Sequence, residues 1–506
     1  MHRKTHLSIL LILLPLLSIG QSWKRIPGEV KGRRTGRGIP YAQVRILNSS
    51  IGVITNFSGE FRISIPERHF NDTLRISSIG YQSKDISIQT LLDSIFLSVS
   101  LGERIYSLEE IAIKEKRGKE LHPEEIVRRA VNRVKRNLPD EEMMLKGFYR
   151  DYLLKGGEYI NLMEAALKVY DKGIQTYDHK KTQIELEQFR FRQDIQIDTF
   201  QSGSYASGEK KIPEMEMNYA GQNEFSILRL HDPIRNFKHP SFAFVFITNK
   251  YFLAYHNFKL DSLIIQDENF LYAISFDLID DPFYKHIIEG KLFIRASDFA
   301  ILKFSYTNFF MPEEEEEGVR YEVLVEYQDF QDRMVLKYIS MNNYLNARSG
   351  NPTFRIDTII ADTSANRLIL RFNKPLDFRS SGNPKSYKVW IDGNRYKVER
   401  VIHNAPDEVS IPFKKKLHIS SPDQIQLETG NILSSYGEIL NVYPTASMYQ
   451  YREFFVNEVE IGEWKEGERV FMNKELPLYR SEIEAIPGFW ENYNMVLSQP
   501  LKKLER

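Results

Sequence analysis

The first candidate for chemistry in this sequence is a single His-x-x-Glu pair, His122 and Glu125. Zinc peptidases use two ligands at this spacing, because a histidine and a carboxylate so placed can share one face of a helix. A catalytic zinc site also needs a third protein ligand, and no histidine-rich segment nearby supplies one. Pro123, Glu124 and Glu125 are equally typical of a helix N-terminus. The sequence therefore favours a helix start over a metal site.

Other recognisable catalytic motifs are missing from the sequence. The chain has no cysteine, which excludes thiol catalysis and disulfides. It contains no Gly-x-Ser-x-Gly nucleophile elbow, no His-Glu-x-x-His zinc motif and no Gly-x-x-x-x-Gly-Lys-Ser/Thr phosphate loop. Carboxylates are plentiful, but the sequence cannot select two of them as a glycosidase pair. We therefore predict no catalytic, cofactor-binding or metal-binding residues and no cofactor.

Three further groups are weaker candidates for a site. His231 and Asp232, followed by Pro233, could form a His-Asp contact, but an ordinary polar loop explains them better. Glu313–Glu317 could collect Ca²⁺, but this run lacks the alternating spacing and the glycine of a calcium loop. We expect a solvated, self-repelling loop there. A basic N-terminal group could touch lipid head groups or polyanionic glycans. It consists of Lys24, Arg25, Lys31, Arg33, Arg34 and Arg37.

Aromatic residues crowd one part of the chain, where they could stack on sugars or hold an acyl chain. Packing in a core explains most of them, because aromatic side chains are usually buried. The segment His239–Tyr255 is nonetheless apolar enough to line a groove in a curved sheet. The crowded aromatics are Tyr205, Tyr219, Phe237, Phe242, Phe244, Phe246, Tyr251, Phe252 and Tyr255.

The composition is that of an ordinary globular protein. Hydrophobic residues make up 42% of the chain and charged residues 27%, which excludes a largely disordered protein. Aromatic residues, at 12%, favour β-structure. Lys+Arg and Asp+Glu both number 68, so the chain lacks the basic field of a nucleic-acid-binding protein. A length of 506 residues suggests about three domains.

The first 20 residues have the order of a secretion signal. Arg3 and Lys4 precede the apolar stretch Leu7–Ile19, which ends beside the small residues Ser18 and Gly20. Because this stretch is too short to span a bilayer comfortably, we interpret residues 1–20 as a cleaved signal peptide, with a retained anchor as the alternative. No later segment approaches 18 apolar residues, so we expect no transmembrane helix. We expect export to the periplasm or the outer membrane.

Residues 23–113 contain short alternating strands separated by turn residues, a pattern that indicates an antiparallel sandwich. Asn56 and Gly59 suit the first and last positions of a type I turn. Phe61 and Ile63 then point to the same face of the following strand. We expect this hairpin to build the core of the sandwich.

The same region resembles the carboxypeptidase-like regulatory domain, a small prealbumin-like β-sandwich. The matching segments are Gly28–Gly32, Gly38–Ile46, Gly52–Ile65 and Leu74–Ile86. The resemblance implies a fold and no peptidase activity, because this module accompanies many different proteins, including outer-membrane transporters.

Residues 114–356 begin with one expected helix, His122–Leu138, whose apolar residues recur at helical spacing before Pro139. Its basic face could lie on an anionic membrane, but packing of the helix against a sheet explains the pattern better. Long alternating strands follow, as in Gly290–Tyr306 with its turn at Ala296–Phe299. We predict a curved antiparallel sheet around a helix or groove. This pattern resembles the half-barrel of periplasmic lipoprotein carriers.

In Asn366–Gly393 a strand, the segment Lys374–Asp377 and a second strand from Tyr387 follow one another. This order resembles bacterial Ig-like domains of the surface-layer type, and we place the module at residues 357–441. Residues 442–506 include a closing segment, Gly488–Val496, with the order Phe-Trp-x-x-Tyr-Asn. Secreted Bacteroidota proteins that join a regulatory sandwich to a β-rich region end in a similar way. The resemblance implies that the Ig-like module is an insertion and that Arg452–Val459 returns to the middle sheet.

The predicted fold class is mainly β: a prealbumin-like sandwich, a curved antiparallel sheet with one amphipathic helix, and an Ig-like sandwich. We predict a non-catalytic secreted envelope protein for binding or assembly, with an apolar ligand groove in the middle domain. Its partner would be an envelope protein, a glycan or a lipid, and no nucleic acid. Two alternatives stay open: a hydrolase, either peptidase or glycosidase, with an unrecognised site in the middle domain, and a soluble relative of an outer-membrane receptor.

Overall fold

The structure is a computed structural model. It describes residues 22–47, 49, 51–106, 122–156, 158–191, 210–211, 223–236, 250–266, 269–279, 287–312, 314, 317–348, 351–419, 421–462 and 470–497. The predicted signal peptide, residues 1–20, lies outside them. The chain is mostly β, as predicted, and divides into two compact units, residues 1–345 with 448–506 and residues 346–447. Within the described residues, every helix is too short or too polar to cross a bilayer.

The first unit begins with a β-sandwich of two sheets, ordered β4-β1-β7 and β3-β2-β5-β6. Its strands are β1 (Trp23–Gly32), β2 (Gln43–Ile46), β3 (Gly52–Ile54), β4 (Glu60–Pro66), β5 (Thr73–Ser77), β6 (Lys84–Ser87) and β7 (Leu97–Leu101). Alternate side chains of these strands face inward and form one apolar core.

The segment between β3 and β4 forms the predicted turn, but β3 pairs with β2 in one sheet and β4 with β1 in the other. The expected hairpin is therefore wrong: this turn connects the two sheets of the sandwich. The side-chain oxygen of Asn56 accepts the backbone N–H groups of Ser58 at 3.0 Å and Glu60 at 2.9 Å. Gly59 has a φ of 81°, a conformation that glycine adopts without strain. Phe61 and Ile63 are buried in the sandwich core.

A third, much larger sheet follows in the same unit. Its described order is β11-β10-β9-β26-β18-β17-β16-β15-β14-β13-β8, and β12 pairs with β18. Neighbouring strands from β13 to β18, and from β26 to β11, are antiparallel. Its elements are β8 (Ile105–Tyr106), α3 (Pro123–Asn137), β9 (Met143–Lys155), β10 (Glu158–Asp171), α4 (Asp178–Lys181), β11 (Gln183–Phe191), β12 (Lys210–Lys211), α5 (Glu224–Leu230), α6 (Lys250–Tyr255), β13 (His256–Gln266), β14 (Asn269–Leu278), β15 (Ile287–Arg295), β16 (Ile301–Phe309), β17 (Val319–Phe330), β18 (Arg333–Arg348) and β26 (Thr445–Ile461).

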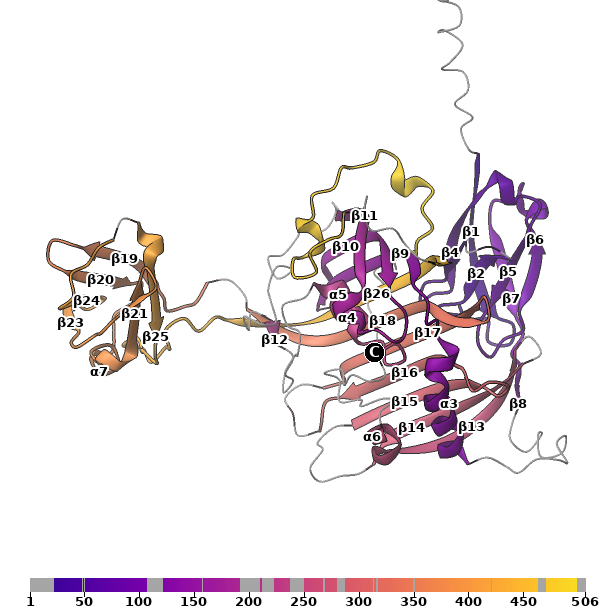
Figure 1. Cartoon of the computed structure of the whole chain (residues 1–506), viewed down its shortest axis with the longest axis horizontal. Helices are drawn as coiled ribbons and strands as arrows, with labels where there is room; N and C mark the ends of the chain where they lie inside the picture. Colours follow the sequence, from indigo (N-terminus) through magenta and orange to yellow (C-terminus); the bar gives the residue numbers. More distant parts are fainter. Residues whose placement is uncertain are drawn as a thin grey trace, which may run out of the picture. The chain divides into compact units, whose positions relative to one another are not determined.

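Helix α3 packs against this sheet, as the sequence predicts. Pro123 occupies the first turn, Glu124 and Glu125 favour its positive end, and the basic residues Lys135 and Arg136 lie in its last turn. Its apolar stripe belongs to the core of the large sheet, and the helix contacts β13 and β15 (Figure 1). The basic face of α3 therefore stays in water while the apolar face is covered.

The last described segment ties the sandwich to the large sheet within the first unit. Asn494 accepts the backbone N–H of Ser64 at 2.7 Å and donates to its carbonyl at 3.2 Å. The Tyr493 hydroxyl donates to the carbonyl of Gly147 on β9 at 3.0 Å. Residues of both parts, including Ile54 of β3 and residues of β9, β18 and β26, share a small apolar core with this segment.

The second unit is a β-sandwich with its own core. One sheet has the order β19-β20-β24-β23 and the other β22-β21-β25. Its elements are β19 (Ile356–Asp362), β20 (Arg367–Phe372), α7 (Phe378–Ser381), β21 (Tyr387–Ile391), β22 (Asn394–Tyr396), β23 (Ile402–Ala405), β24 (Glu408–Pro412) and β25 (Ile425–Thr429). The unit lies in the sequence between β18 and β26, which are neighbours in the large sheet.

We expect that the second unit can be removed without unfolding the first. The Ser447 hydroxyl donates to the side-chain oxygen of Asn346 at 2.8 Å, so the two ends of the unit lie together. Replacing residues 349–444 by a short Gly-Asn turn is expected to leave the thermal midpoint of the first unit unchanged, because neighbouring strands need only a short connection. Circular dichroism melting curves of the full and shortened chains test this. Loss of cooperative melting in the shortened chain would contradict it.

Candidate functional site

The sheet face that carries helices is occupied by the protein's own side chains. Val127 of α3, Phe225 of α5 and Phe252 of α6 all belong to one buried core together with residues of β9 to β18. Ring centroids of Phe252 and Phe276 lie 5.2 Å apart, and those of Phe225 and Tyr149 lie 5.1 Å apart. An apolar ligand groove was expected on this sheet, but at these residues the apolar surface packs against helices.

The crowded aromatic segment contributes to this packing. Phe252 is 1% exposed and lies in the core, whereas Tyr255 is partly buried at the end of α6. The other members of the group that the sequence singled out lie outside the residues or side chains that the structure describes.

A buried group of two carboxylates and two guanidinium groups, which we name the charged cluster, lies beside α5. Arg229 donates to Asp171 at 2.9 Å and to Asp178 at 2.8 Å. Arg235 donates to both oxygens of Asp171, at 2.8 and 2.9 Å. All four side chains are at most 6% exposed. The cluster is electrically neutral, because the two carboxylates compensate the charges of the two guanidinium groups.

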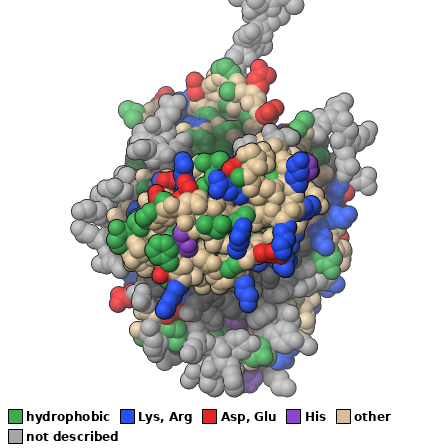
Figure 2. Space-filling model, turned by 90° about the vertical axis from the view of Figure 1, so that its left-hand side faces the viewer, with side chains coloured by type: hydrophobic (Ala, Val, Ile, Leu, Met, Phe, Trp, Pro, Cys, Tyr) green, Lys and Arg blue, Asp and Glu red, His purple; other side chains and the backbone are tan. Residues whose placement is uncertain are grey.

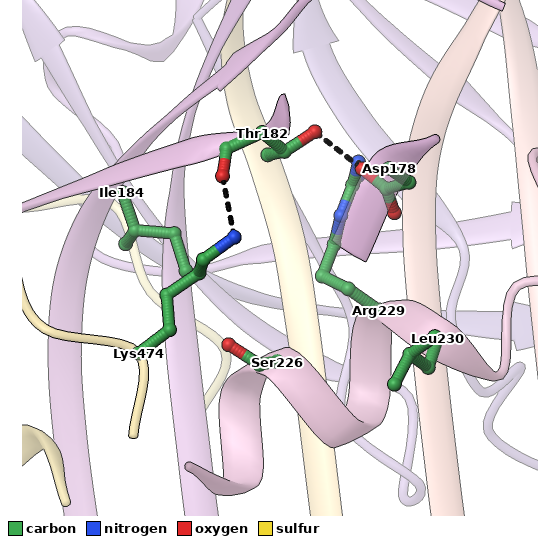
Figure 3. A pocket seen from close by; sticks show the side chains of 7 residues that line it. All are labelled: Asp178, Thr182, Ile184, Ser226, Arg229, Leu230 and Lys474. Carbon is green, nitrogen blue, oxygen red and sulfur yellow. Dashed lines mark hydrogen bonds and ion pairs between the residues drawn. The ribbon is translucent and has the colours of Figure 1, made fainter. Parts of the chain in front are cut away.

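A small cavity of about 20 Å³ adjoins the charged cluster (Figure 3). Lys474 reaches into it and donates to the carbonyl of Thr182 at 3.0 Å, and the Thr182 hydroxyl donates to Asp178 at 2.5 Å. Burial alone would raise the pKa of Asp178, but attraction by Arg229 and Arg235 outweighs burial and lowers this pKa below its usual value. The volume is enough for a water molecule and too small for a substrate.

His231 and Asp232 lie in a turn after α5, as expected, but both side chains are buried, which the sequence did not predict. His231 is 3% exposed and its Nδ1 lies 2.6 Å from the carbonyl of Ile227. Asp232 is 0% exposed and accepts the Tyr327 hydroxyl at 2.7 Å as well as two backbone N–H groups. The neighbouring apolar helix α5 is buried, and it carries these polar residues into the interior with it.

His122 and Glu125 lie at the start of a helix, the role that the sequence favoured over a zinc site. His122 precedes the first turn of α3, and Glu125 forms ion pairs with Arg128 at 2.7 Å and with Arg129 at 2.8 Å. Among the described residues, no group of three or more His, Cys, Asp or Glu side chains could hold a metal ion.

The acidic run is only partly a solvated loop. Glu317 is exposed, but Glu314 is half-buried and forms an ion pair with the fully buried guanidinium of Arg320. The other three glutamates lie outside the described residues. In the basic N-terminal group, Arg25 donates to the side-chain oxygen of Asn492 at 3.1 and 3.2 Å. Arg25 therefore bonds to another residue of the first unit.

Sequence reasoning missed a Ser-His pair in the second unit. The Ser381 hydroxyl lies 2.8 Å from Nε2 of His403 and donates to the carbonyl of Asp377 at 2.5 Å. Such a pair could activate a nucleophile. Ser381 is 0% exposed, so a substrate cannot reach its oxygen in this conformation. The pair, which lies 22 residues apart in the sequence, therefore fits a structural role.

A second cavity, of about 160 Å³, lies between the sandwich and the large sheet in the first unit. We name it the junction cavity. The Gln43 side chain of β2 donates to that of Gln328 of β17 at 3.0 Å across the junction, and the rings of Tyr41 and Tyr338 lie 5.1 Å apart. Its lining residues are Gln43, Arg45, Arg75, Ser77, Ser78, Ile79, Leu302, Glu326, Tyr327, Gln328, Asp329 and Lys337. The cavity is thus lined mostly by polar and charged side chains.

Residues 26–113 match the CarboxypepD_reg-like domain, which confirms the predicted identity of the sandwich. None of the curated proteins matches the chain. A LolA superfamily protein from Nitrosomonas europaea is similar in structure, with 11% identity, coverage of 44% of this chain and 86% of that one, and a TM-score of 0.21. A DUF1329 family protein from Desulfovibrio piger has 6% identity, the same two coverages and a TM-score of 0.20. Likenesses this weak carry no conclusion for this chain.

Proposed function

We propose that this chain is a secreted, non-catalytic envelope protein that acts by binding or assembly. One observation carries the proposal: among the described residues, apolar side chains of α3, α5 and α6 pack on the large sheet in one buried core, where an apolar ligand was expected. An apolar ligand would have to displace a packed core, at a cost of several kcal/mol for each large side chain removed. A role for the outer surfaces and for the junction cavity needs no such displacement.

The pairing of the buried charges supports the same proposal. A catalytic carboxylate usually stands in a cleft where its proton can be exchanged with a substrate. Glu326 lines the junction cavity, but it accepts from Lys303 at 2.7 Å and from Lys337 at 2.9 Å. Burial of this carboxylate is outweighed by the two cations, which lower its pKa to about 2 and keep it ionised. These three residues hold neighbouring strands together, since Lys303, Glu326 and Lys337 come from β16, β17 and β18.

The surface of the second unit offers chemistry for a partner. Phe378 is 62% exposed and Tyr436 is 74% exposed, and their segments are joined by a β-bridge between Leu376 and Ser434. Figure 2 shows hydrophobic side chains interspersed with Lys and Arg side chains on one face of the molecule. Exposed aromatic residues are typical of protein interfaces. This surface supports assembly with a protein or a glycan.

The support for secretion comes from the N-terminal sequence. A charged start, a short apolar stretch and small residues before residue 21 support export, after which the mature chain would act in the periplasm or at the outer membrane.

Purification of the mature chain from its native envelope, followed by mass spectrometry of what accompanies it, tests the proposal. We expect a protein or glycan partner that is lost when the second unit is excised. Turnover of a peptide or glycoside library by the purified chain would overturn the non-catalytic role. A lipid present at about one molecule per chain would overturn the closed helix-bearing face.

A further inference from the structure

The junction cavity contains an uncompensated positive charge on the sandwich side. Arg45 of β2 lies directly opposite Arg75 of β5, and Arg75 lies directly opposite Asp85 of β6. Arg75 donates to both oxygens of Asp85, each at 2.7 Å. The row thus contains two cations and one carboxylate, and that carboxylate is fully engaged by Arg75. Like charges directly opposite in a sheet repel each other unless something lies between them.

Arg45 has no carboxylate of its own. Its Nε atom is buried and has no hydrogen-bond partner among the described residues. The opposite charge that acts on it is Asp329, which is 58% exposed and accepts from Arg295 at 2.7 Å. Burial and repulsion by Arg75 lower the pKa of Arg45, which is the direction expected for a guanidinium that lacks a partner.

The wall formed by the large sheet does not supply the missing negative charge. Lys337 and Glu326 both line the cavity, and Glu326 is shared between Lys337 and Lys303. Counting only lining residues, three cations (Arg45, Arg75 and Lys337) face two carboxylates (Glu326 and Asp329). Glu326 accepts from Lys337 and Lys303, and Asp329 accepts from Arg295, so Arg45 has neither carboxylate to itself.

We propose that the junction cavity binds a small oxyanion, a carboxylate or phosphate group, with Arg45 as its principal ligand. The planar fork of a guanidinium matches two oxygens of such a group and gives short, charge-assisted hydrogen bonds. Ser77 and Ser78 line the same cavity and can donate hydroxyl hydrogens to a remaining oxygen. The volume of about 160 Å³ is close to that of an engineered cavity that accepts benzene, so an oxyanion of a few heavy atoms fits.

The anion site specifies which class of ligand the proposed binding role would use. The biological meaning of the site rests on the proposed function, but the existence of the site does not. Anion binding is measured on the purified chain, whereas partners are sought in the native envelope. A chain that binds phosphate but recovers no partner would weaken the proposed function and leave the anion site standing. A chain that recovers a partner but binds neither anion would overturn the anion site and leave the proposed function standing.

The test compares the mature chain with its Arg45→Gln variant. Both are titrated by isothermal calorimetry with potassium phosphate and, separately, with potassium acetate, at an ionic strength held constant with potassium chloride. The two arms distinguish a phosphate-bearing ligand from a carboxylate-bearing one. Arg62→Gln is the matched control, because Arg62 is an exposed arginine on β4 of the same sandwich.

We expect the mature chain and Arg62→Gln to bind at least one of the two anions, and Arg45→Gln to bind it about tenfold more weakly or worse. We also expect Arg45→Gln to melt at or above the temperature of the mature chain in chloride alone, because the substitution removes repulsion from Arg75. Equal binding by Arg45→Gln, or no binding of either anion by the folded mature chain, would overturn the proposal. A lower melting temperature of Arg45→Gln in chloride would also count against it, since it would assign Arg45 a structural role.

Discussion

Replacing Asp171 by Asn is expected to lower the free energy of unfolding of the first unit by about 3–5 kcal/mol. Asp171 lies between the guanidinium groups of Arg229 and Arg235, and all three side chains are nearly inaccessible to water. Asn keeps the shape of Asp but removes its charge, which leaves two buried cations to share Asp178. Breaking one partner of a buried ion pair is costly because the remaining charge keeps its desolvation penalty.

Urea denaturation of the mature chain, followed by fluorescence, measures this effect. Asp261→Asn in the same unit is the matched control, because Asp261 pairs with Lys291 at 3.1 Å while the Lys291 side chain remains 41% exposed. We expect this control to change the midpoint far less, since partly exposed pairs contribute little. Equal effects of the two substitutions would show that the charged cluster does not hold the fold.

Acid is expected to destabilise the first unit through His231, with a slope of up to about 1.4 kcal/mol per pH unit. Burial lowers the pKa of His231 to about 3, while the pKa of an unfolded histidine is near 6.5. Between these values the unfolded chain binds a proton that the folded chain does not. The stabilising contribution is therefore complete above pH about 6.5 and is lost progressively as the pH falls toward 3.

The His231→Gln variant, which cannot titrate, isolates this contribution. We expect its free energy of unfolding to fall less steeply between pH 6.5 and 4.5 than that of the mature chain, even if its stability at pH 7.5 is lower. His122→Gln provides the control, because His122 is exposed in the same unit. Equal slopes for His231→Gln and the mature chain would rule out His231 as the source of the acid sensitivity.

The parts of the fold that sequence patterns predicted are those set by local contacts. The turn from Asn56 to Gly59 is made by bonds between residues at most four apart, and the apolar stripe of α3 follows from helical spacing. Residues 26–113 also carry enough of a known pattern to be matched to a domain family.

The features that sequence reasoning missed depend on register between distant strands. Arg45 and Arg75 are 30 residues apart, and only the pairing of β2 with β5 shows that they face each other. Asp171 and Arg235 are 64 residues apart, so nothing local distinguishes this pair from ordinary surface charges. Burial of Asp232 had one usable signal, the strongly apolar helix α5 immediately before it. The covering of the sheet by three helices could not be foreseen, because the two short ones, α5 and α6, have few residues to show a period.

The central claim is that, at the described residues of α3, α5 and α6, the sheet is covered by packed side chains, and that the protein acts from its surfaces and the junction cavity. Its most direct test locks α3 in place. Arg333 of β18 donates to the carbonyl of Arg136 at the end of α3 at 3.3 Å. Because the chain has no cysteine, Arg136→Cys with Arg333→Cys creates a unique pair that a short bismaleimide can crosslink.

The measurement is native mass spectrometry of the crosslinked and uncrosslinked double variants after incubation with lipid extracted from the envelope. We predict that neither form carries a lipid and that both retain the protein or glycan partner recovered with the mature chain. A lipid adduct on the uncrosslinked form that disappears on crosslinking would contradict the claim, because it would show that α3 moves aside to admit an apolar ligand.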